Sequence, residues 1–344
     1  MNIELLAAEA KQASIKLAAI DTETKNKALK SIADALQARS AEIISANKED
    51  VERSEKDNLA APLLKRLKYD ASKIKETTEG IASLMMLPEP IGETLKSTEL
   101  DKDLELYKVS CPIGVIGVIF ESRPDALVQI SSLCLKSSNA VILKGGSEAQ
   151  KTNKILAEII AQSTEKAGIP KGWIQLIETR SDVNEMLKCD KFIDLIIPRG
   201  SNEFVQYIMN NSNIPVLGNA DGIWHEYVDK DADIDMAVKV STDSKCQYVA
   251  VCNATETLLV HDAIAKTFLP LLKSSLDKYN VEIFGCEKTQ KIIPVQAASE
   301  QDWKSEYLDY KISIKVVASI DEAINHINTY SSGHTETIIT SNKM

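Results

Sequence analysis

Strand-like and helix-like patterns alternate four times between residues 115 and 210, and this alternation limits the possible folds more than any other feature of the chain. The strand-like stretches, such as Val115–Phe120 and Asn139–Leu143, are short and almost wholly apolar, which is typical of strands buried on both faces. Asp125–Leu135 and Glu148–Ala167 have the length and periodicity of crossover helices. Further strands are predicted at 174–177, 193–197 and from 215, and further helices at 182–187 and 202–209. We therefore predict an α/β fold with a parallel, Rossmann-type sheet.

The flanking sequence predicts a helical N-terminal region and a second domain. Residues 1–90 carry apolar residues at three- and four-residue spacing until Met85–Pro90 breaks the helical pattern. Leu104–Ser110 alternates like a strand, and beyond the sheet the amphipathic Asp233–Lys245 precedes a strand-like run, Thr257–Val260. Because 344 residues exceed one ordinary domain, we predict two, at 1–220 and 221–344.

Charge, cysteine spacing and hydropathy argue against several classes of protein. The formal net charge of −10 argues against a general affinity for nucleic acid or for an anionic membrane. The six cysteines are scattered without the spacing of a zinc site, so no metal is expected. The N-terminus lacks the features of a secretory signal, and the longest apolar runs are too short to span a bilayer. We expect reduced thiols in a cytoplasmic protein without nucleic-acid or membrane partners.

Two glycine-containing turns each follow a predicted strand and precede a predicted helix. They are Lys144-Gly145-Gly146-Ser147 and Pro198-Arg199-Gly200-Ser201. Glycine lets a phosphate approach the backbone, a helix N-terminus favours anions, and Lys144 adds a positive charge suited to a ribose or a 2′-phosphate. Two such turns in one sheet favour an extended dinucleotide across the strand ends. Taken alone, the first turn is equally consistent with an ordinary strand-to-helix connection.

The segment Glu121-Ser122-Arg123 ends the strand that begins at Val115, at the position where α/β folds bind ligands. Arg123 suits a carboxylate or a phosphate, because its planar guanidinium binds two oxygens at once. The alternative is an ion pair in a surface loop.

Cys252 lies between the amphipathic segment and the strand that follows it, where a thiol can face a cleft. Cysteine is among the most buried residue types, so the alternative is an inert core residue. Upstream, Asp221-Gly222 is consistent with a simple turn, and His225 is predicted to be a structural histidine.

Several segments taken together resemble one family of enzymes. They are Pro112–Pro124, Cys134–Ala149, Asp194–Ser201, Val251–His261, Asp321–Asn328 and Ser332–Glu336. In this order they strongly resemble the glutamate-5-semialdehyde dehydrogenases, also called γ-glutamyl phosphate reductases, of the aldehyde dehydrogenase superfamily. The resemblance covers essentially the whole chain. It implies an aldehyde dehydrogenase-like fold with an NADP-binding domain, an α/β catalytic domain and a β-strand oligomerisation arm near 104–112, and hence a homo-oligomer.

The resemblance also implies roles for individual residues. Cys252 becomes the nucleophile, with its own backbone N–H and Asn253 as candidate donors to an oxyanion. Arg123 and Asp221 are predicted to contact the substrate. The residues predicted to bind NADP are Glu121, Ser122, Lys144, Gly145, Ser147, Pro198, Gly200 and Ser201.

The implied reaction is NADPH-dependent reduction of L-γ-glutamyl phosphate to L-glutamate 5-semialdehyde with release of phosphate, on the route to proline. Channelling of the substrate from glutamate 5-kinase is one implied arrangement. Hydrolytic aldehyde dehydrogenases carry a glutamate base in the segment matching Gly218–Gly222, and its absence here favours the reductase. A hydrolytic aldehyde dehydrogenase and an inactive NADP-binding or scaffold protein are the alternatives.

Members of this family continue beyond the position of Met344. We therefore expect an incomplete, C-terminally truncated catalytic domain. We also expect Leu104–Ser110 to lack a partner strand, which would leave an exposed edge.

Overall fold

The computed structural model describes residues 2–59, 61–121, 123–200, 202–218 and 222–342. The chain divides into two compact units, residues 1–218 and 219–344, each with its own parallel sheet and hydrophobic core. Among the described residues, no helix combines the length and apolar content needed to cross a membrane.

Unit 1 contains a four-stranded parallel sheet of order β5-β4-β3-β6. Its strands are β3 (Val115–Ile119), β4 (Ala140–Lys144), β5 (Ile174–Ile177) and β6 (Leu195–Pro198). All residues of β3 are buried, as its continuous apolar run predicts for a central strand. The chain moves outward from β3 through β4 to β5 and then returns to the other side of β3 for β6. The strand order therefore reverses between β3 and β6, and α/β sheets bind dinucleotides at the carboxyl ends of strands beside such a reversal.

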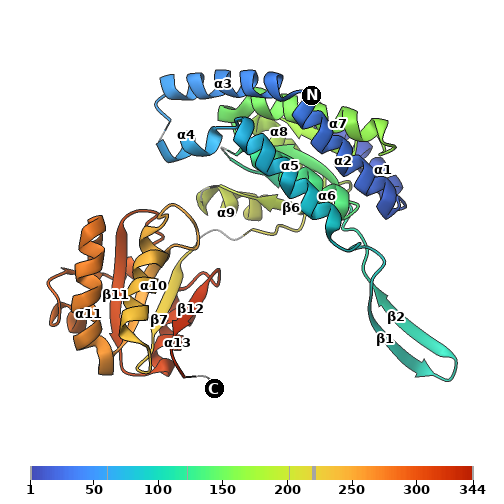
Figure 1. Ribbon diagram of the computed structural model, residues 1–344. Helices are drawn as coiled ribbons and strands as arrows, with labels where there is room; N and C mark the ends of the chain where they lie inside the picture. The colour runs from blue at the N-terminus through green and yellow to red at the C-terminus, as the bar shows by residue number, and fades with distance from the viewer. Residues whose placement is uncertain (1, 60, 122, 201, 219–221, 343–344) are drawn as a thin grey trace. The chain divides into compact units, whose positions relative to one another are not determined.

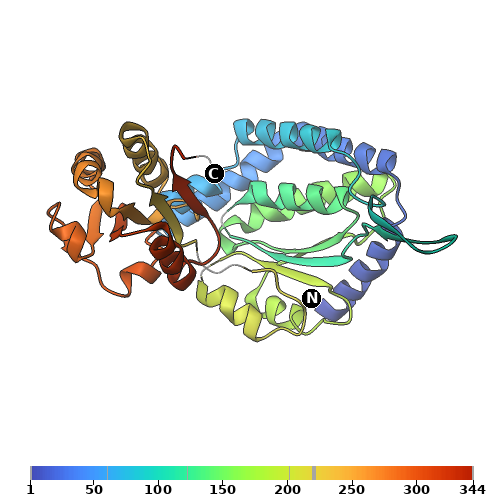
Figure 2. The ribbon, with the colours of Figure 1, turned by 90° about the horizontal axis from the view of Figure 1, so that it is seen from below.

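Helices cover both faces of this sheet (Figure 2). The connecting helices are α6 (Pro124–Lys136), α7 (Gln150–Lys166) and α8 (Arg180–Met186), and α9 (Asn202–Asn210) follows β6. From the N-terminal region, α1 (Ile3–Leu17) packs on β4 and α8. The helices α2 (Thr22–Ala38), α3 (Ser40–Lys56) and α5 (Ala71–Met86) pack over α6 and α7, and α4 (Ala61–Leu67) joins α3 to α5. The predicted helical region 1–90 thus encloses the sheet layer.

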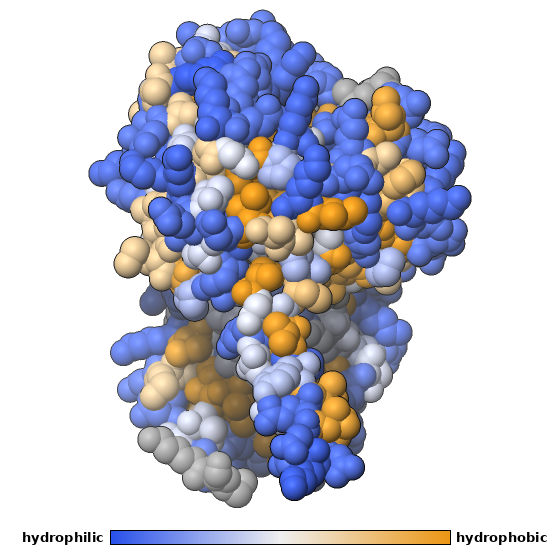
Figure 3. Space-filling model, turned by 90° about the vertical axis from the view of Figure 1, so that its right-hand side faces the viewer, coloured by the Kyte–Doolittle hydropathy of each residue, from blue (hydrophilic) through white to orange (hydrophobic). Residues whose placement is uncertain are grey.

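An antiparallel hairpin, β1 (Thr94–Asp101) and β2 (Leu104–Val109), extends away from the rest of unit 1 (Figure 1). Nearly all its side chains are exposed, including Leu100, Leu106 and Tyr107. The side of the molecule in Figure 3 likewise shows apolar side chains scattered among polar ones. Because β2 pairs along its length with β1, the expectation that Leu104–Ser110 lacks a partner strand is wrong.

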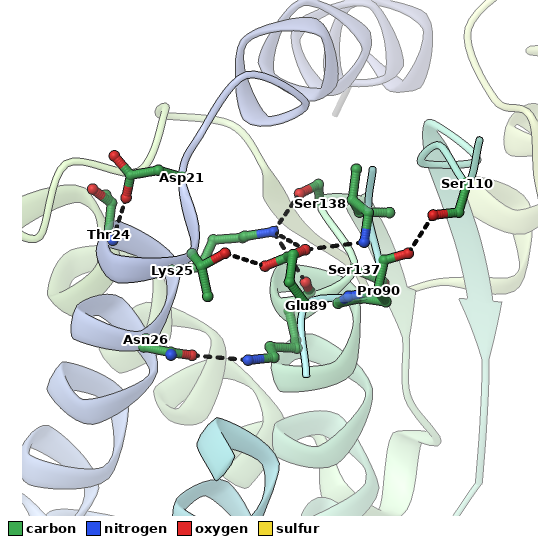
Figure 4. A network of polar contacts seen from close by, with 12 residues as sticks. Asp21, Thr24, Lys25, Asn26, Glu89, Pro90, Ser110, Ser137 and Ser138 are labelled. Atoms are coloured by element: carbon green, nitrogen blue, oxygen red, sulfur yellow. Dashed lines mark hydrogen bonds and ion pairs between the residues drawn. The ribbon is translucent and has the colours of Figure 1, made fainter. Parts of the chain in front are cut away.

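A buried polar network anchors the base of this hairpin (Figure 4). The Lys25 ammonium, 2% exposed, donates to Glu89 Oε1 at 2.6 Å and to Ser138 Oγ at 3.0 Å. Ser110 Oγ donates to Pro90 O at 2.7 Å and so joins the two chains that enter and leave the hairpin. The network connects the hairpin base with α2 and with the end of α6.

Unit 2 contains a six-stranded parallel sheet of order β10-β9-β11-β8-β7-β12. The strands are β7 (Trp224–Val228), β8 (Thr255–His261), β9 (Glu282–Gly285), β10 (Gln296–Ala297), β11 (Lys311–Val317) and β12 (Glu336–Ile339). The larger core lies between one face of this sheet and the helices α10 (Ile234–Cys246) and α11 (Asp262–Leu276). A smaller apolar cluster on the other face packs against α13 (Ile320–Tyr330). The short α12 (Glu287–Gln290) follows β9.

Two predicted elements differ from the structure. Pro215–Leu217 does not form a strand. It makes two hydrogen bonds with Ile196, from the Ile196 N–H to Pro215 O and from the Leu217 N–H to Ile196 O, and the pairing with β6 remains an isolated parallel bridge. The helix predicted from Glu148 begins at Gln150, after a single 3₁₀ turn at Ser147–Ala149.

Candidate active site

The carboxyl ends of the four strands in unit 1 lie level with one another. In the sheet register, Ile119 at the end of β3 pairs with Lys144 of β4 on one side and with Pro198 of β6 on the other. Lys144 in turn pairs with Ile177 at the end of β5. The predicted cofactor residues that follow these strands therefore lie along one edge, at the point where the strand order reverses.

The turn after β4 brings bare backbone to this edge. A Cβ placed on Gly145 would collide with the Asn153 amide and stand 3.3 Å from Phe120 Cε2. A Cβ on Gly146 would collide with the carboxylate of Glu148. In both cases the nearest atoms belong to the end of a side chain, and without a Cβ the backbone of the two glycines is open to a close approach by a phosphate or a ribose.

The first N–H groups of α7 are already paired within unit 1. Those of Lys151 and Thr152 donate to the Asp50 carboxylate at 3.3 and 2.8 Å. These groups are therefore committed to the protein. The turn presents to a ligand the Gly145–Gly146 backbone and the Lys144 ammonium.

Four charged side chains influence one another at this edge: Glu121, Lys144, Glu148 and Arg180. Partial burial and the Glu148 carboxylate raise the pKa of Glu121, and the two cations only partly oppose them. Partial burial lowers the pKa of Lys144, and the positive charge of Arg180 lowers it further. The carboxylates of Glu148 and Glu121 oppose this shift only in part. Two cations and two carboxylates within electrostatic range suit a ligand that carries both phosphate and ribose hydroxyls.

The turn after β6 connects back to β3. The Arg199 N–H donates to Ile119 O at 2.7 Å, which joins the ends of the two strands at the reversal point. A Cβ on Gly200 would stand 3.2 Å from Glu121 Oε1 and 3.1 Å from Phe204 Cδ1. Gly200 therefore lies beside the charged group, whereas Ser122 and Ser201 lie outside the described residues.

Arg123 forms an ion pair at the surface, as the alternative to a ligand-binding role predicted. Its Nη2 lies 2.8 Å from Asp125 Oδ2, and its side chain is exposed at the start of α6. The ion pair occupies part of the guanidinium. Asp221, the other predicted substrate residue, lies outside the described residues.

In unit 2, Cys252 lies at the amino end of the sheet, just before β8 begins at Thr255. It is half-buried, and Gly222, just before β7, packs directly on it. A Cβ on Gly222 would stand 2.8 Å from both Cα and Cβ of Cys252. At the same edge, the Ile223 N–H donates to Ser332 Oγ at 3.1 Å. The structure thus brings Gly222 and Ser332, which are distant in sequence, to the loop that carries Cys252 and Asn253.

Burial distinguishes the six cysteines, which are all free thiols. Burial raises the pKa of Cys134 to about 12 and also raises the pKa values of Cys189 and Cys246. For Cys286, burial acts in the same direction, but hydrogen bonds from Thr289 and from the Val316 N–H outweigh it and lower the pKa. Cys286 is therefore the thiol against which the role of Cys252 has to be tested.

Several ionisable groups are buried in the interior of unit 2. Glu226 accepts hydrogen bonds from the hydroxyls of Ser241, Ser244 and Thr255, and burial still raises its pKa. Lys245 and Glu256 form an ion pair at 2.8 Å with both side chains almost fully buried. Burial lowers the pKa of Lys245 and raises that of Glu256, while their mutual attraction opposes both shifts.

The α13 face of the same sheet holds a histidine pair. The rings of His225 on β7 and His326 on α13 lie 5.4 Å apart, edge to face. Burial lowers the pKa of His225 to about 4 and, together with Lys315, lowers that of His326 to about 3. His225 is thus neutral and enclosed, which agrees with a structural role. Its Nδ1 lies 3.2 Å from Ile223 O, but its buried Nε2 has no hydrogen-bond partner among the described residues, so it is not the fully satisfied histidine that was expected.

The aldehyde dehydrogenase family model matches residues 1–313. The γ-glutamyl phosphate reductase of Acetivibrio thermocellus is 66% identical over 343 residues, which cover 100% of this chain and 80% of the relative. The chain belongs to the γ-glutamyl phosphate reductases of the aldehyde dehydrogenase family. These findings confirm the resemblance and the fold class predicted from the sequence.

Solved structures agree with this assignment. The γ-glutamyl phosphate reductase of Thermotoga maritima is 40% identical, with a TM-score of 0.95 over 99% of this chain and 83% of that one. The corresponding enzyme of Saccharomyces cerevisiae is 35% identical, with a TM-score of 0.61 over 99% and 87%.

Sequence reasoning did not identify Asp50, Arg180 or Ser332 as members of these clusters. Asp50 lies on α3, about a hundred residues before the backbone that it contacts, and no local motif marks it. Arg180 is the first residue of α8, and no motif in the sequence relates it to the turn after β4. Ser332 lies in a segment matched for its family resemblance, and its contact with Ile223 required the fold.

Proposed function

We propose that the chain catalyses the NADPH-dependent reduction of L-γ-glutamyl 5-phosphate to L-glutamate 5-semialdehyde and phosphate. The observation that carries this proposal is the 66% identity to a γ-glutamyl phosphate reductase over the whole chain. The arrangement of both units supports it, because each provides one part of the required chemistry. Unit 1 offers a dinucleotide edge, and unit 2 offers a half-buried thiol at the end of a sheet.

The thiol of Cys252 supplies the nucleophile. As a thiolate it attacks the acyl carbon of the substrate, a carbon–sulfur bond forms, and the carbon–oxygen bond to phosphate breaks, which leaves a thioester. NADPH, when bound, supplies the hydride that reduces this thioester carbonyl. The carbon–sulfur bond then breaks, which returns the thiolate and releases the aldehyde. The Cys252 N–H and Asn253 are assigned to the oxyanion that forms in the attack and in the reduction.

The cofactor site is assigned to the strand ends of unit 1. The backbone without Cβ atoms at Gly145 and Gly146 and the adjacent Lys144 fit a dinucleotide that needs close backbone approach and a positive charge. We assign Glu121, Ser122, Lys144, Gly145, Ser147, Pro198, Gly200 and Ser201 to the cofactor. The preference for NADP over NAD is assigned to Lys144 and Arg180, whose charges oppose those of Glu148 and Glu121.

Arg123 and Asp221 are assigned to the substrate. For Arg123 this requires that its guanidinium binds a substrate oxygen in addition to, or in place of, the Asp125 carboxylate. We also propose that the protein works in the cytoplasm as a homo-oligomer joined through the β1–β2 hairpin. Its substrate would come from a glutamate 5-kinase.

The reverse reaction tests the proposed function. Purified protein should reduce NADP with glutamate semialdehyde in repeated turnovers only when phosphate is present, because phosphate is needed to release the acyl group from the thioester. Turnover without phosphate would instead identify a hydrolytic aldehyde dehydrogenase. NADPH binding without any turnover would identify an inactive binding protein.

A matched pair of variants locates the nucleophile. Cys252→Ala should abolish turnover, whereas Cys286→Ala should keep it, although Cys286 has the lowered pKa. Activity that survives Cys252→Ala and is lost in Cys286→Ala would overturn the assignment.

A further inference from the structure

Three polar residues on α3 point at the beginning of α7. Asn47, Asp50 and Arg53 are spaced three apart and so share one side of the helix. Their hydrogen bonds reach the segment 147–152, which connects the glycine turn of the cofactor edge to α7. This contact joins residues about a hundred positions apart in the sequence.

Asp50 holds the first turn of α7. Its side chain is completely buried, and its carboxylate accepts hydrogen bonds from the N–H groups of Lys151 and Thr152. The Thr152 hydroxyl donates to the same carboxylate at 2.8 Å. A buried carboxylate with several donors is a strong and geometrically restrictive contact.

Arg53 holds the 3₁₀ turn that precedes α7. Its Nη2 donates to Ser147 O at 2.9 Å and to Glu148 O at 3.1 Å, and it also pairs with Asp50 Oδ1 at 2.8 Å. Glu148 is one of the four charges at the cofactor edge, and its carboxylate lies over Gly146. Arg53 therefore fixes the backbone on which this carboxylate is carried.

Asn47 ties the same stripe to the connection between α4 and α5. Its Nδ2 donates to Leu67 O at 2.9 Å and to Thr152 Oγ1 at 3.2 Å, and its Oδ1 accepts from the Tyr69 N–H at 2.8 Å. Because Asn47 is itself buried and held at both ends, α3 has a fixed position relative to the turn.

We infer that Asp50 and Arg53 are positioning residues of the cofactor site, which hold the Gly146–Glu148 turn in the geometry that binds the dinucleotide. This inference rests on the proposed function. The two residues act through the turn: Asp50 through the first N–H groups of α7, and Arg53 through two carbonyl oxygens. A site supported in this way loses affinity when the support is removed, even though no contact to the ligand is lost.

The test compares Arg53→Met with Arg39→Met. Arg39 makes the matched contact, since its Nη2 pairs with Glu42 at 2.7 Å and reaches Glu158 of α7 at 3.6 Å, away from the turn. NADPH binding is titrated by fluorescence, and kcat and KM are measured for both substrates. Arg53→Met should weaken NADPH binding about tenfold, because it removes the charge-assisted hydrogen bonds to the two carbonyl oxygens and the ion pair with Asp50. It should leave kcat and the KM for the acyl substrate near wild type.

Arg53→Lys is the second variant, because a lysine keeps the charge but replaces the planar guanidinium with a compact ammonium on a shorter side chain. It should restore part of the NADPH affinity, and Arg39→Met should bind NADPH like the wild type. Equal NADPH affinity in Arg53→Met and wild type would overturn the inference alone, as would an equal loss in Arg39→Met. A wild-type protein that binds no NADPH would overturn the proposed function and the inference with it.

Discussion

The candidate site residues of the two units lie at opposite ends of their parallel sheets. In unit 1, the predicted ligand residues follow the carboxyl ends of β3, β4 and β6, and their charges are open to the edge. In unit 2, the candidate nucleophile precedes β8, at the amino end of the sheet, next to Gly222 and Ile223. The rule that places ligands at the carboxyl ends of parallel strands therefore applies to the candidate cofactor residues and not to the candidate nucleophile.

The two units also differ in where their ionisable side chains lie. The four charges that we propose for the cofactor site of unit 1 gather at the carboxyl edge of its sheet, where a ligand can interact with them. Unit 2 instead encloses Glu226, the Lys245–Glu256 pair and two histidines within its fold. Buried groups of this kind hold a structure together and make it sensitive to their removal. We therefore expect substitutions at the charges of unit 2 to change stability, and substitutions at the edge of unit 1 to change binding.

The largest expected effect is a loss of stability when an ion pair is broken, and it should differ between one pair in each unit. Lys245→Met leaves Glu256 unpaired and 1% exposed, whereas Lys25→Met in unit 1 leaves Glu89, whose side chain is 25% exposed. Lys245→Met should lower the free energy of unfolding by about 3–5 kcal/mol, and Lys25→Met by less, because water can reach Glu89. Chemical denaturation followed by fluorescence measures both, since Trp173 reports on unit 1 and Trp224 and Trp303 report on unit 2. Equal losses would contradict the difference in burial.

Gly222→Val tests the amino edge of unit 2. The added side chain must displace the Cys252 backbone, which stands 2.8 Å from the first added carbon. Turnover should fall about a hundredfold, because a shift of about 1 Å in the position of a catalytic group can lower the rate by that factor. NADPH affinity should remain unchanged. Gly80→Ala is the control, because a Cβ there meets no atom within 4 Å. A fall in NADPH affinity in Gly222→Val would contradict the assignment of the cofactor and the nucleophile to different units.

Acid should weaken unit 2 through its histidines. Their pKa values, about 4 for His225 and about 3 for His326, lie below the ordinary value of 6.5. The unfolded chain therefore binds protons first as the pH falls below 6.5. Their contribution to stability is present above pH 6.5 and is lost as the pH falls toward 4 for His225 and toward 3 for His326, by about 1.6 kcal/mol per histidine between pH 6.5 and 5.

The variant His326→Asn isolates this effect. The slope of the unfolding free energy against pH should be shallower in His326→Asn than in the wild type. The raised pKa values of Glu226 and Glu256 act in the opposite direction in both proteins and so cancel in the comparison. His334→Asn, which alters an exposed histidine of the same unit, is the control. An unchanged slope in His326→Asn would show that His326 is not held neutral in the fold.

The smallest expected effect concerns the cofactor edge. In Gly145→Ala the new methyl group meets the end of the flexible Asn153 side chain, which can move aside. NADPH affinity should fall about tenfold or less, because backbone approach is hindered without loss of a charge. The rate at which iodoacetamide labels Cys252 should not change. A change in that labelling rate with unaltered NADPH binding would contradict the assignment of the cofactor to unit 1 and of the nucleophile to unit 2.

The sequence was sufficient for elements whose burial is periodic. The apolar runs of β3 and β4 and the spacing in α7 depend only on neighbouring residues, so the sheet of unit 1 was predictable nearly to its ends. The strand Thr94–Asp101 was missed because it is exposed on both faces and carries no alternation.

Some features of the candidate sites could also be predicted from the sequence, and others could not. The glycine turns and Cys252 have local motifs, whereas the contact of Asp50 with Thr152 and that of Gly222 with Cys252 exist only once the chain has folded. Such contacts join segments that no local pattern relates.

The most direct measurement follows a single turnover in the reverse direction without phosphate. Protein mixed with glutamate semialdehyde and NADP should form about one NADPH per active chain and then stop, with the acyl group held as a thioester. Peptide mass spectrometry should locate that group on Cys252, and added phosphate should release it and restart turnover. An acyl group on Cys286, or NADPH formation that continues without phosphate, would contradict the account.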